Sequence, residues 1–180
     1  MNQIDPVFGQ HQSILRAGRK AYVAANSHLF LVRRAPTFTS KSDWDDDISF
    51  ATRVHDVDQL NDDDEADDVE HEGWIVVPVK KRDDGPFPDR IGVGRARNCD
   101  VVLRFPSVSK LHAQFRLGTG LQLVDVGAVN GTSVNGQALA PRVPHNVKAR
   151  DALRFGLVHV ELLDAGQLFD LIDSLTNAGV

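Results

Sequence analysis

The chain has 180 residues, 42% of them hydrophobic, which is enough to form the core of one medium-sized domain or two small ones. Its single cysteine, Cys99, excludes an internal disulfide, and we find neither a bilayer-spanning apolar run nor a signal peptide, so we expect a soluble, cytoplasmic protein. The net charge of −5 is unevenly spread: residues 43–72 hold fourteen acidic residues and one basic residue, net −13, and the remainder carries +8. Such a basic body suits nucleic acid or a phosphorylated protein, and composition alone does not choose between them.

The N-terminal third is expected to contain a helix, a strand and a disordered segment. Residues 28–34 (HLFLVRR) form a short apolar run closed by Pro36, which is typical of a strand. Residues 36–72 include the acidic run and few large apolar side chains, so burial cannot offset their ordering entropy and we expect disorder. Residues 1–26 are expected to be partly helical, because small and apolar residues recur there at helical spacing: Ile14, Leu15, Gly18, Ala21, Tyr22 and Ala25.

From Trp74 onward the sequence alternates between short β-like runs and turns. The turn segments are rich in Gly, Asn, Asp and Pro, and many short strands at near-regular spacing indicate an all-β sandwich or barrel. Residues 167–175 are then expected to form a helix, with four apolar side chains on one face. The expected strands are WIVVPV (74–79), DRIGVGR (89–95), CDVVL (99–103), HAQFRL (112–117), LQLVDV (121–126), ALRFG (152–156) and VHVELL (158–163).

Three loop segments carry the most informative residues. They are GVGRARNCDVVL (92–103), PSVSKLHAQF (106–115) and VDVGAVNGTSVNG (124–136). In order and spacing they contain Gly-Arg, then Ser-x-x-His, then Asn-Gly-Thr, and DALRFG (151–156) follows. Together these four pieces closely resemble the forkhead-associated (FHA) domain family, over about residues 74–163 and back to the strand at 28–34.

The resemblance implies an FHA-type eleven-stranded β-sandwich whose loops at one end bind a phosphothreonine peptide. On this basis we expect an FHA domain at residues 27–163, interrupted between its first two strands by the disordered acidic insertion at 36–72. A partly helical extension at 1–26 and a C-terminal helix at 164–180 would flank it.

The residue types in these loops suit a phosphate ligand. Phosphothreonine carries about −1.5 to −2 charges and three acceptor oxygens. Arg95 offers a planar fork that bonds two of them, Ser109 offers a compact hydroxyl donor, and Lys110 adds a mobile positive charge. Gly94 precedes the arginine, and a position without a Cβ allows close approach or unusual backbone angles.

The resemblance also assigns supporting roles. It implies that His112 is buried and hydrogen-bonded behind the loops rather than catalytic, and that Asn130 bonds the main chain of the peptide. Asn-Gly is also a turn signal in its own right, and we expect Asn130 to serve both purposes. Gly131 would supply the positive φ of that turn, and Thr132 and Asn135 are expected to be structural.

Two loop positions depart from the family pattern. Immediately before the loop asparagine the family often has a polar residue that contacts the phosphate or the peptide, and this chain has Val129. One position earlier the family often has a serine, and this chain has Ala128. We therefore expect either a modest affinity for phosphate or a greater dependence of phosphate binding on Lys110 and Arg97. Cys99 is expected to be part of the core.

Other chemistries lack support in the sequence. There is no P-loop, zinc or EF-hand pattern and no nucleophile–base pair, so we expect no enzyme activity, metal or cofactor. No aromatic stripe interleaves with the basic residues, so nucleic acid is not the expected partner. The leading hypothesis is a phosphothreonine-binding signalling adaptor downstream of Ser/Thr kinases. The alternative is a phosphate-independent interaction scaffold on the same fold.

Overall fold

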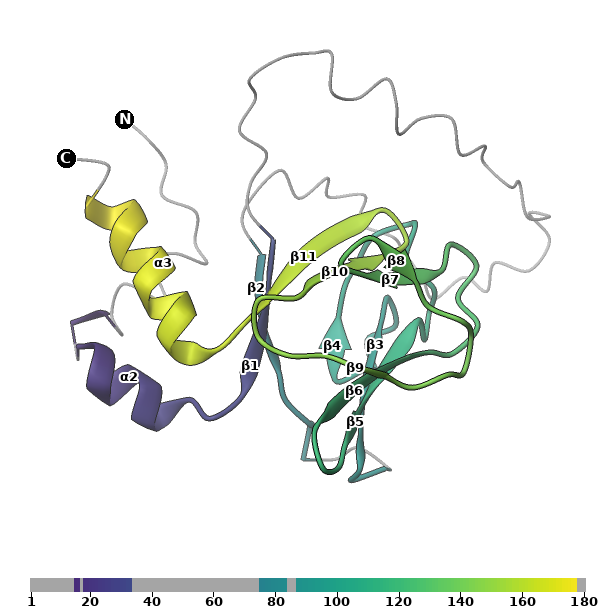
Figure 1. The fold of residues 1–180 in the computed structure, drawn as a ribbon, viewed down its shortest axis with the longest axis horizontal. Coiled ribbons are helices and arrows are strands. Elements are labelled where there is room, and N and C mark those ends of the chain that lie inside the picture. The colour runs from purple at the N-terminus through teal and green to yellow at the C-terminus, as the bar shows by residue number, and fades with distance from the viewer. Residues whose placement is uncertain (1–14, 17, 34–74, 84–86, 178–180) are drawn as a thin grey trace, which may run out of the picture.

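A computed structural model describes residues 15–16, 18–33, 75–83 and 87–177. Eleven strands in these residues form two packed sheets, ordered β2-β1-β11-β10-β7-β8 and β4-β3-β5-β6-β9 (Figure 1). The expected all-β, eleven-stranded sandwich is confirmed, whereas the expected disorder at 36–72 lies outside the described residues. The strands are β1 (Leu29–Arg33), β2 (Ile75–Val79), β3 (Arg90–Gly94), β4 (Val101–Val102), β5 (Ala113–Leu117), β6 (Leu121–Asp125), β7 (Thr132–Val134), β8 (Gln137–Ala138), β9 (His145–Asn146), β10 (Ala152–Phe155) and β11 (Val158–Leu163).

The main core lies between the two sheets. In β5 and β10 buried residues alternate with less buried ones, in agreement with the two-residue period of a strand. Phe115 on β5 and Phe155 on β10, one from each sheet, are both fully buried in this core. In these two strands the burial pattern therefore follows the alternation in the sequence.

Strand β1 is buried on both of its faces. Leu31 belongs to the core between the sheets, whereas Phe30 and Val32 belong to a second apolar cluster on the outer face. This explains why the run at 28–34 is continuously apolar rather than alternating.

Two helices cover that outer face. They are α2 (Arg19–Ala25) and α3 (Ala165–Asn177), which lie beside each other next to β1 (Figure 1). A reciprocal pair of bonds between Asp164 and Gln167 caps the start of α3, with N···O distances of 3.1 and 2.8 Å. Neither helix has the length and apolar character needed to cross a membrane, and no other described helix does.

Strand register brings separate loops to one end of the sandwich. Val93 near the end of β3 pairs with Ala113 at the start of β5, which in turn pairs with Asp125 at the end of β6. In the other sheet, Phe155 at the end of β10 pairs with Thr132 at the start of β7. The loops after β3, before β5, between β6 and β7 and after β10 therefore share one end.

Candidate functional site

The loop after β3 (the first loop), the loop before β5 (the second loop) and the loop between β6 and β7 (the third loop) contain the expected site residues. The first and second loops are joined through their backbones. The Arg95 N–H donates to the Ser109 carbonyl at 3.0 Å, and the Ala96 N–H donates to the Lys110 carbonyl at 3.1 Å. These bonds continue the pairing of β3 and β5 past the end of the sheet. They place Arg95 beside Ser109, although fourteen residues separate them in the sequence.

Gly94 makes this contact possible. A Cβ atom at this position would lie 2.2 Å from the Lys110 carbonyl oxygen, which is rigid backbone. The same oxygen accepts a bond from the Cys99 thiol at 3.2 Å. Cys99 is buried, as expected for a core residue, and burial raises the pKa of its thiol, so it stays protonated and able to donate.

The third loop is joined to the second by two further bonds. The Val129 N–H donates to the Ser109 hydroxyl at 3.3 Å, and the Asn130 side-chain amide donates to the Ser107 carbonyl at 2.9 Å. The three loops therefore form one continuous surface. Ser109 lies at its centre, in contact with both of the other loops.

Arg95 carries a shielded side-chain donor in this surface. It is half-buried, and its Nε–H is shielded from solvent with no acceptor in the described part of the chain. Buried donors are normally hydrogen-bonded, so this N–H is available to an acceptor on a binding partner. Lys110 and Arg97 are both exposed on the same two loops.

His112 holds the second and third loops from behind. It is fully buried, accepts the Ser109 N–H at Nδ1 (3.0 Å), and contacts the Gly131 carbonyl through Nε2 (3.0 Å). Because Nδ1 is an acceptor and the carbonyl needs a donor, the ring is neutral with its proton on Nε2. Burial lowers the pKa of His112, in agreement with this state.

The third loop is shaped by a buried carboxylate. Asp125 accepts the N–H groups of Gly127 (2.7 Å) and Ala128 (2.9 Å) on one oxygen and the Thr132 hydroxyl (2.6 Å) on the other. Gly131 adopts the expected positive φ, at 65°. The sequence analysis missed Asp125; the Asp-x-Gly spacing, which is typical of a turn bonded to its own side chain, could have indicated it.

Asn135 lies outside the loop surface. Together with Gly136 it forms the two-residue turn between β7 and β8, with φ values of 51° and 81°. Its side chain bonds Asp151 at 3.0 Å and the Ala152 N–H at 2.9 Å, so its contacts are structural.

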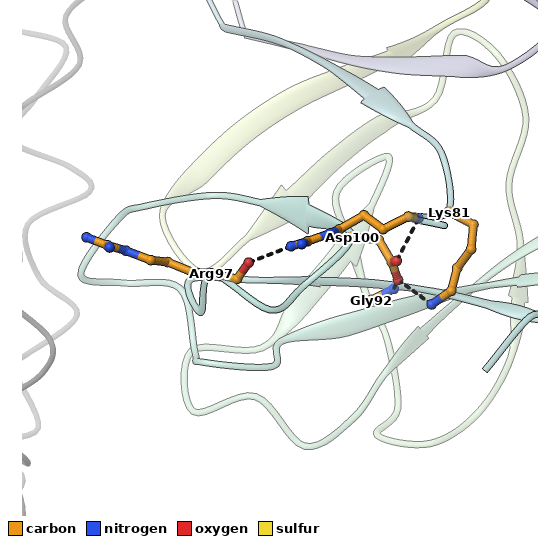
Figure 2. Close-up of polar contacts among 5 residues, drawn as sticks. Lys81, Gly92, Arg97 and Asp100 are labelled. Carbon is orange, nitrogen blue, oxygen red and sulfur yellow. Dashed lines mark hydrogen bonds and ion pairs between the residues drawn. The ribbon is translucent and has the colours of Figure 1, made fainter. Parts of the chain in front are cut away.

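A second carboxylate, also missed from the sequence, fixes the first loop. Figure 2 shows Asp100 bonded to the Lys81 ammonium (3.0 Å) and to the Gly92 N–H (2.7 Å), and it also accepts the Arg82 N–H at 3.0 Å. Burial alone would raise the pKa of Asp100, but these bonds outweigh it and hold that pKa below its usual value. The Arg82 guanidinium also donates to the Arg97 carbonyl at 2.8 Å.

Comparison with known proteins matches this region to one family. Residues 91–156 match the family model of the FHA domain. The mediator of DNA damage checkpoint protein 1 of Rattus norvegicus is 36% identical over 77 residues, covering 38% of this chain and 6% of that protein. The oxoglutarate dehydrogenase inhibitor of Corynebacterium efficiens is 38% identical over 64 residues, covering 35% of this chain and 43% of that protein.

The comparison with solved structures also finds FHA domains among its matches. The FHA domain of the CT664 protein of Chlamydia trachomatis aligns with a TM-score of 0.42 and 22% identity, covering 51% of this chain and 85% of that one. The chain spans 10% or less of the length of three of the curated relatives it matches. The residues that match the FHA domain model run from β3 to the end of β10 and include all three loops of the surface.

Proposed function

We propose that this chain is a phosphothreonine-dependent protein-binding module that acts as a signalling adaptor downstream of Ser/Thr kinases. The observation that carries the proposal is the unpaired, shielded Nε–H of Arg95 beside Ser109, at the junction of three loops. A half-buried guanidinium with a spare donor suits a dianionic group that accepts two bonds at once.

The neighbouring groups complete a phosphate pocket in this proposal. The Ser109 oxygen accepts the Val129 N–H, which leaves the hydroxyl proton for a phosphate oxygen. Asn130 uses one amide proton on Ser107 and keeps its carbonyl oxygen for the main chain of the peptide. Lys110 adds exposed positive charge. The roles assigned to Gly94, His112, Gly131 and Thr132 are to hold these groups in place.

The test is a titration of phosphothreonine peptides from a degenerate library, with matched unphosphorylated, phosphoserine and Asp-substituted peptides. Wild-type protein should bind the phosphothreonine form best. Arg95→Ala should lose about a hundredfold or more in affinity, because charge-assisted bonds contribute about 1.5–3 kcal/mol each. The Asp peptide should not bind, since a carboxylate has one charge and two coplanar oxygens.

Arg90→Ala is the matched control, because Arg90 lies at the opposite end of β3 and makes an exposed ion pair with Asp89. The phosphopeptide affinity of Arg90→Ala should equal that of wild type. Both variants should keep the wild-type melting temperature. Equal phosphopeptide binding by Arg95→Ala and wild type would refute the proposed pocket.

The second candidate function is a phosphate-independent interaction scaffold. One observation favours it: Val129 and Leu157 are 62% and 63% exposed at the same end of the sandwich, and the Leu157 N–H bonds the Ser107 hydroxyl at 3.2 Å. Exposed apolar side chains near one another are typical of protein contact surfaces. Equal affinity for phosphorylated and unphosphorylated peptides would support this function instead.

The domain plan and the location in the cell are also proposals. The pairing of β1 with β2 supports an FHA domain over 27–163 that accommodates the insertion at 36–72 between these strands. The shared cluster of α2 and α3 supports flanking helical segments at 1–26 and 164–180. A lone, buried thiol at Cys99 and a role beside protein kinases support a cytoplasmic, non-enzymatic protein.

A further inference from the structure

The outer face of the five-stranded sheet carries a row of long polar side chains. Arg90 on β3 pairs with Arg116 on β5, and Arg116 pairs with Gln122 on β6. Gln122 in turn pairs with Asn146 on β9, and its side-chain amide donates to the Asn146 side chain at 3.0 Å. Residues directly opposite one another on paired strands share a face of the sheet. Because the adjacent Phe115 belongs to the core between the sheets, this row faces away from the core.

The described helices lie on the other sheet. Helix α3 contacts β1 and β11, and α2 contacts α3. Figure 1 shows both helices on the β1 side of the sandwich, apart from β5, β6 and β9. The outer face of β5 and β6 is therefore not covered by a helix of the described residues.

Arg116 has no counterion within the described part of the chain. It is half-buried, and its Nε–H is shielded from solvent without an acceptor, as at Arg95. The residue opposite it, Arg90, carries the same charge, and like charges directly opposite one another destabilise a sheet. Arg90 is already engaged, by Asp89 at 3.3 Å and by the Phe87 ring, whose centre lies 5.3 Å from the Arg90 Cζ. The uncompensated charge of the row is therefore that of Arg116.

We propose that this face is a second docking surface, which binds a carboxylate-rich segment of a partner protein without any requirement for phosphate. A carboxylate bound to the Arg116 guanidinium would supply the missing counterion, and this charge complementarity selects an acidic partner. Gln114, two residues before Arg116 on the same face, and Gln122 offer side-chain amides to the main chain of that segment. Arg90 is assigned no contact with the partner.

The surface is separate from the loops that contain Arg95 and Ser109. Arg116 pairs with Arg90, which lies at the opposite end of β3 from Gly94, about 13 Å away along the strand. This distance exceeds a Debye length at 0.1 M salt, so a short ligand on the loops and an acidic segment at Arg116 bind independently.

Amide NMR titration of the full chain with unphosphorylated peptides tests the proposal. One short peptide alternates glutamate and threonine, so that its carboxylates lie on one side of an extended strand. The matched peptide alternates glutamine and threonine, and a third probe is a short single-stranded oligonucleotide. Each is titrated into wild type, Arg116→Gln, Arg116→Lys and the charge-matched control Lys20→Gln, which alters an exposed residue on α2.

In wild type the acidic peptide should shift the amide signals of Arg116 and Gln122. Its dissociation constant should be on the order of millimolar at low salt, and binding should weaken at high salt. Arg116→Gln should weaken binding about tenfold, whereas Arg116→Lys, which retains the charge, should keep most of the affinity. Lys20→Gln should bind like wild type. Arg116→Gln should also keep or raise the melting temperature, because it removes the like-charge pair.

Three results would overturn the proposal. The first is a set of shifts confined to the phosphate-binding loops, and the second is equal binding of the glutamine peptide or of Arg116→Gln. The third is tighter binding of the oligonucleotide at Arg116, which would assign this face to nucleic acid instead. Failure of the proposed phosphothreonine function would leave the expected peptide results unchanged, because neither peptide carries a phosphate.

Discussion

Replacing His112 with alanine should destabilise the domain by about 3–5 kcal/mol. The change leaves the Ser109 N–H without its acceptor, and an unpaired buried donor costs about 1–3 kcal/mol. The Gly131 carbonyl is affected less, because it also accepts the Gly156 N–H at 3.0 Å. The remainder comes from the cavity left where the ring packs edge-on against Phe155.

Urea unfolding followed by circular dichroism, together with phosphopeptide titration, measures this effect. Binding should weaken only in proportion to the loss of folded protein, because His112 does not reach the loop surface. His112→Asn keeps a polar group and gives a second, milder variant if alanine prevents folding. Unchanged stability with abolished binding would refute the structural role and place His112 in contact with the ligand.

The pH dependence of stability follows from the same geometry. Burial lowers the pKa of His112 below 6.5, so the unfolded chain takes up the proton more readily than the folded one. The contribution of His112 is complete above pH 6.5 and is lost as the pH falls toward the lowered pKa. Wild type should therefore lose more stability than His112→Asn between about pH 7 and pH 5.5. Parallel curves would refute the assignment of a neutral imidazole.

Three further changes test the support of the loops. Gly94→Ala should lower both the melting temperature and phosphopeptide affinity, because the new Cβ would meet the Lys110 carbonyl at 2.2 Å; wild-type values for both would contradict that contact. Asp100→Asn should loosen the first loop, so that a thiol reagent modifies Cys99 faster than in wild type. An unchanged rate of modification would show that the Asp100 carboxylate is not needed to hold the loop. Replacing residues 42–72 with a short Gly/Ser linker should tighten phosphopeptide binding, mainly at low salt; equal affinity at low and high salt would leave the segment as a solvated loop.

Most of the strands could be predicted from the sequence because they are short apolar runs bounded by turn residues. The strands it missed are β7, β8 and β9, which have only two or three residues each, too few for a period to be visible. Helix α3 was predicted, but it begins at Ala165, two residues before the expected start, because Asp164 and Gln167 cap it. The total of eleven strands came from the family resemblance and not from the periodicity.

The candidate site shows a different limit. Arg95 and Ser109 could be identified by type and order, but their proximity depends on the register of β3 and β5 and on a glycine. Asp100 and Asp125 were missed because a lone aspartate in a loop looks like an ordinary turn residue. Only the structure shows that each carboxylate accepts two backbone N–H groups and so fixes a loop.

The expected effect of residues 42–72 depends on where the chain leaves the sandwich. β1 and β2 pair up to Arg33 and Ile75, so the connecting residues begin and end at one point. The Arg33 guanidinium lies 5.2 Å from the centre of the Phe105 ring, and Phe105 precedes the loop that contains Ser107 and Ser109.

Residues 43–72, of net charge −13, are covalently joined to β1 and β2, and a competitor tethered to its own binding site can reach effective concentrations near millimolar. Carboxylates match phosphate poorly, so competition should be partial, and salt should screen it. Competition of this kind predicts that the affinity gained on removing the segment disappears at high salt.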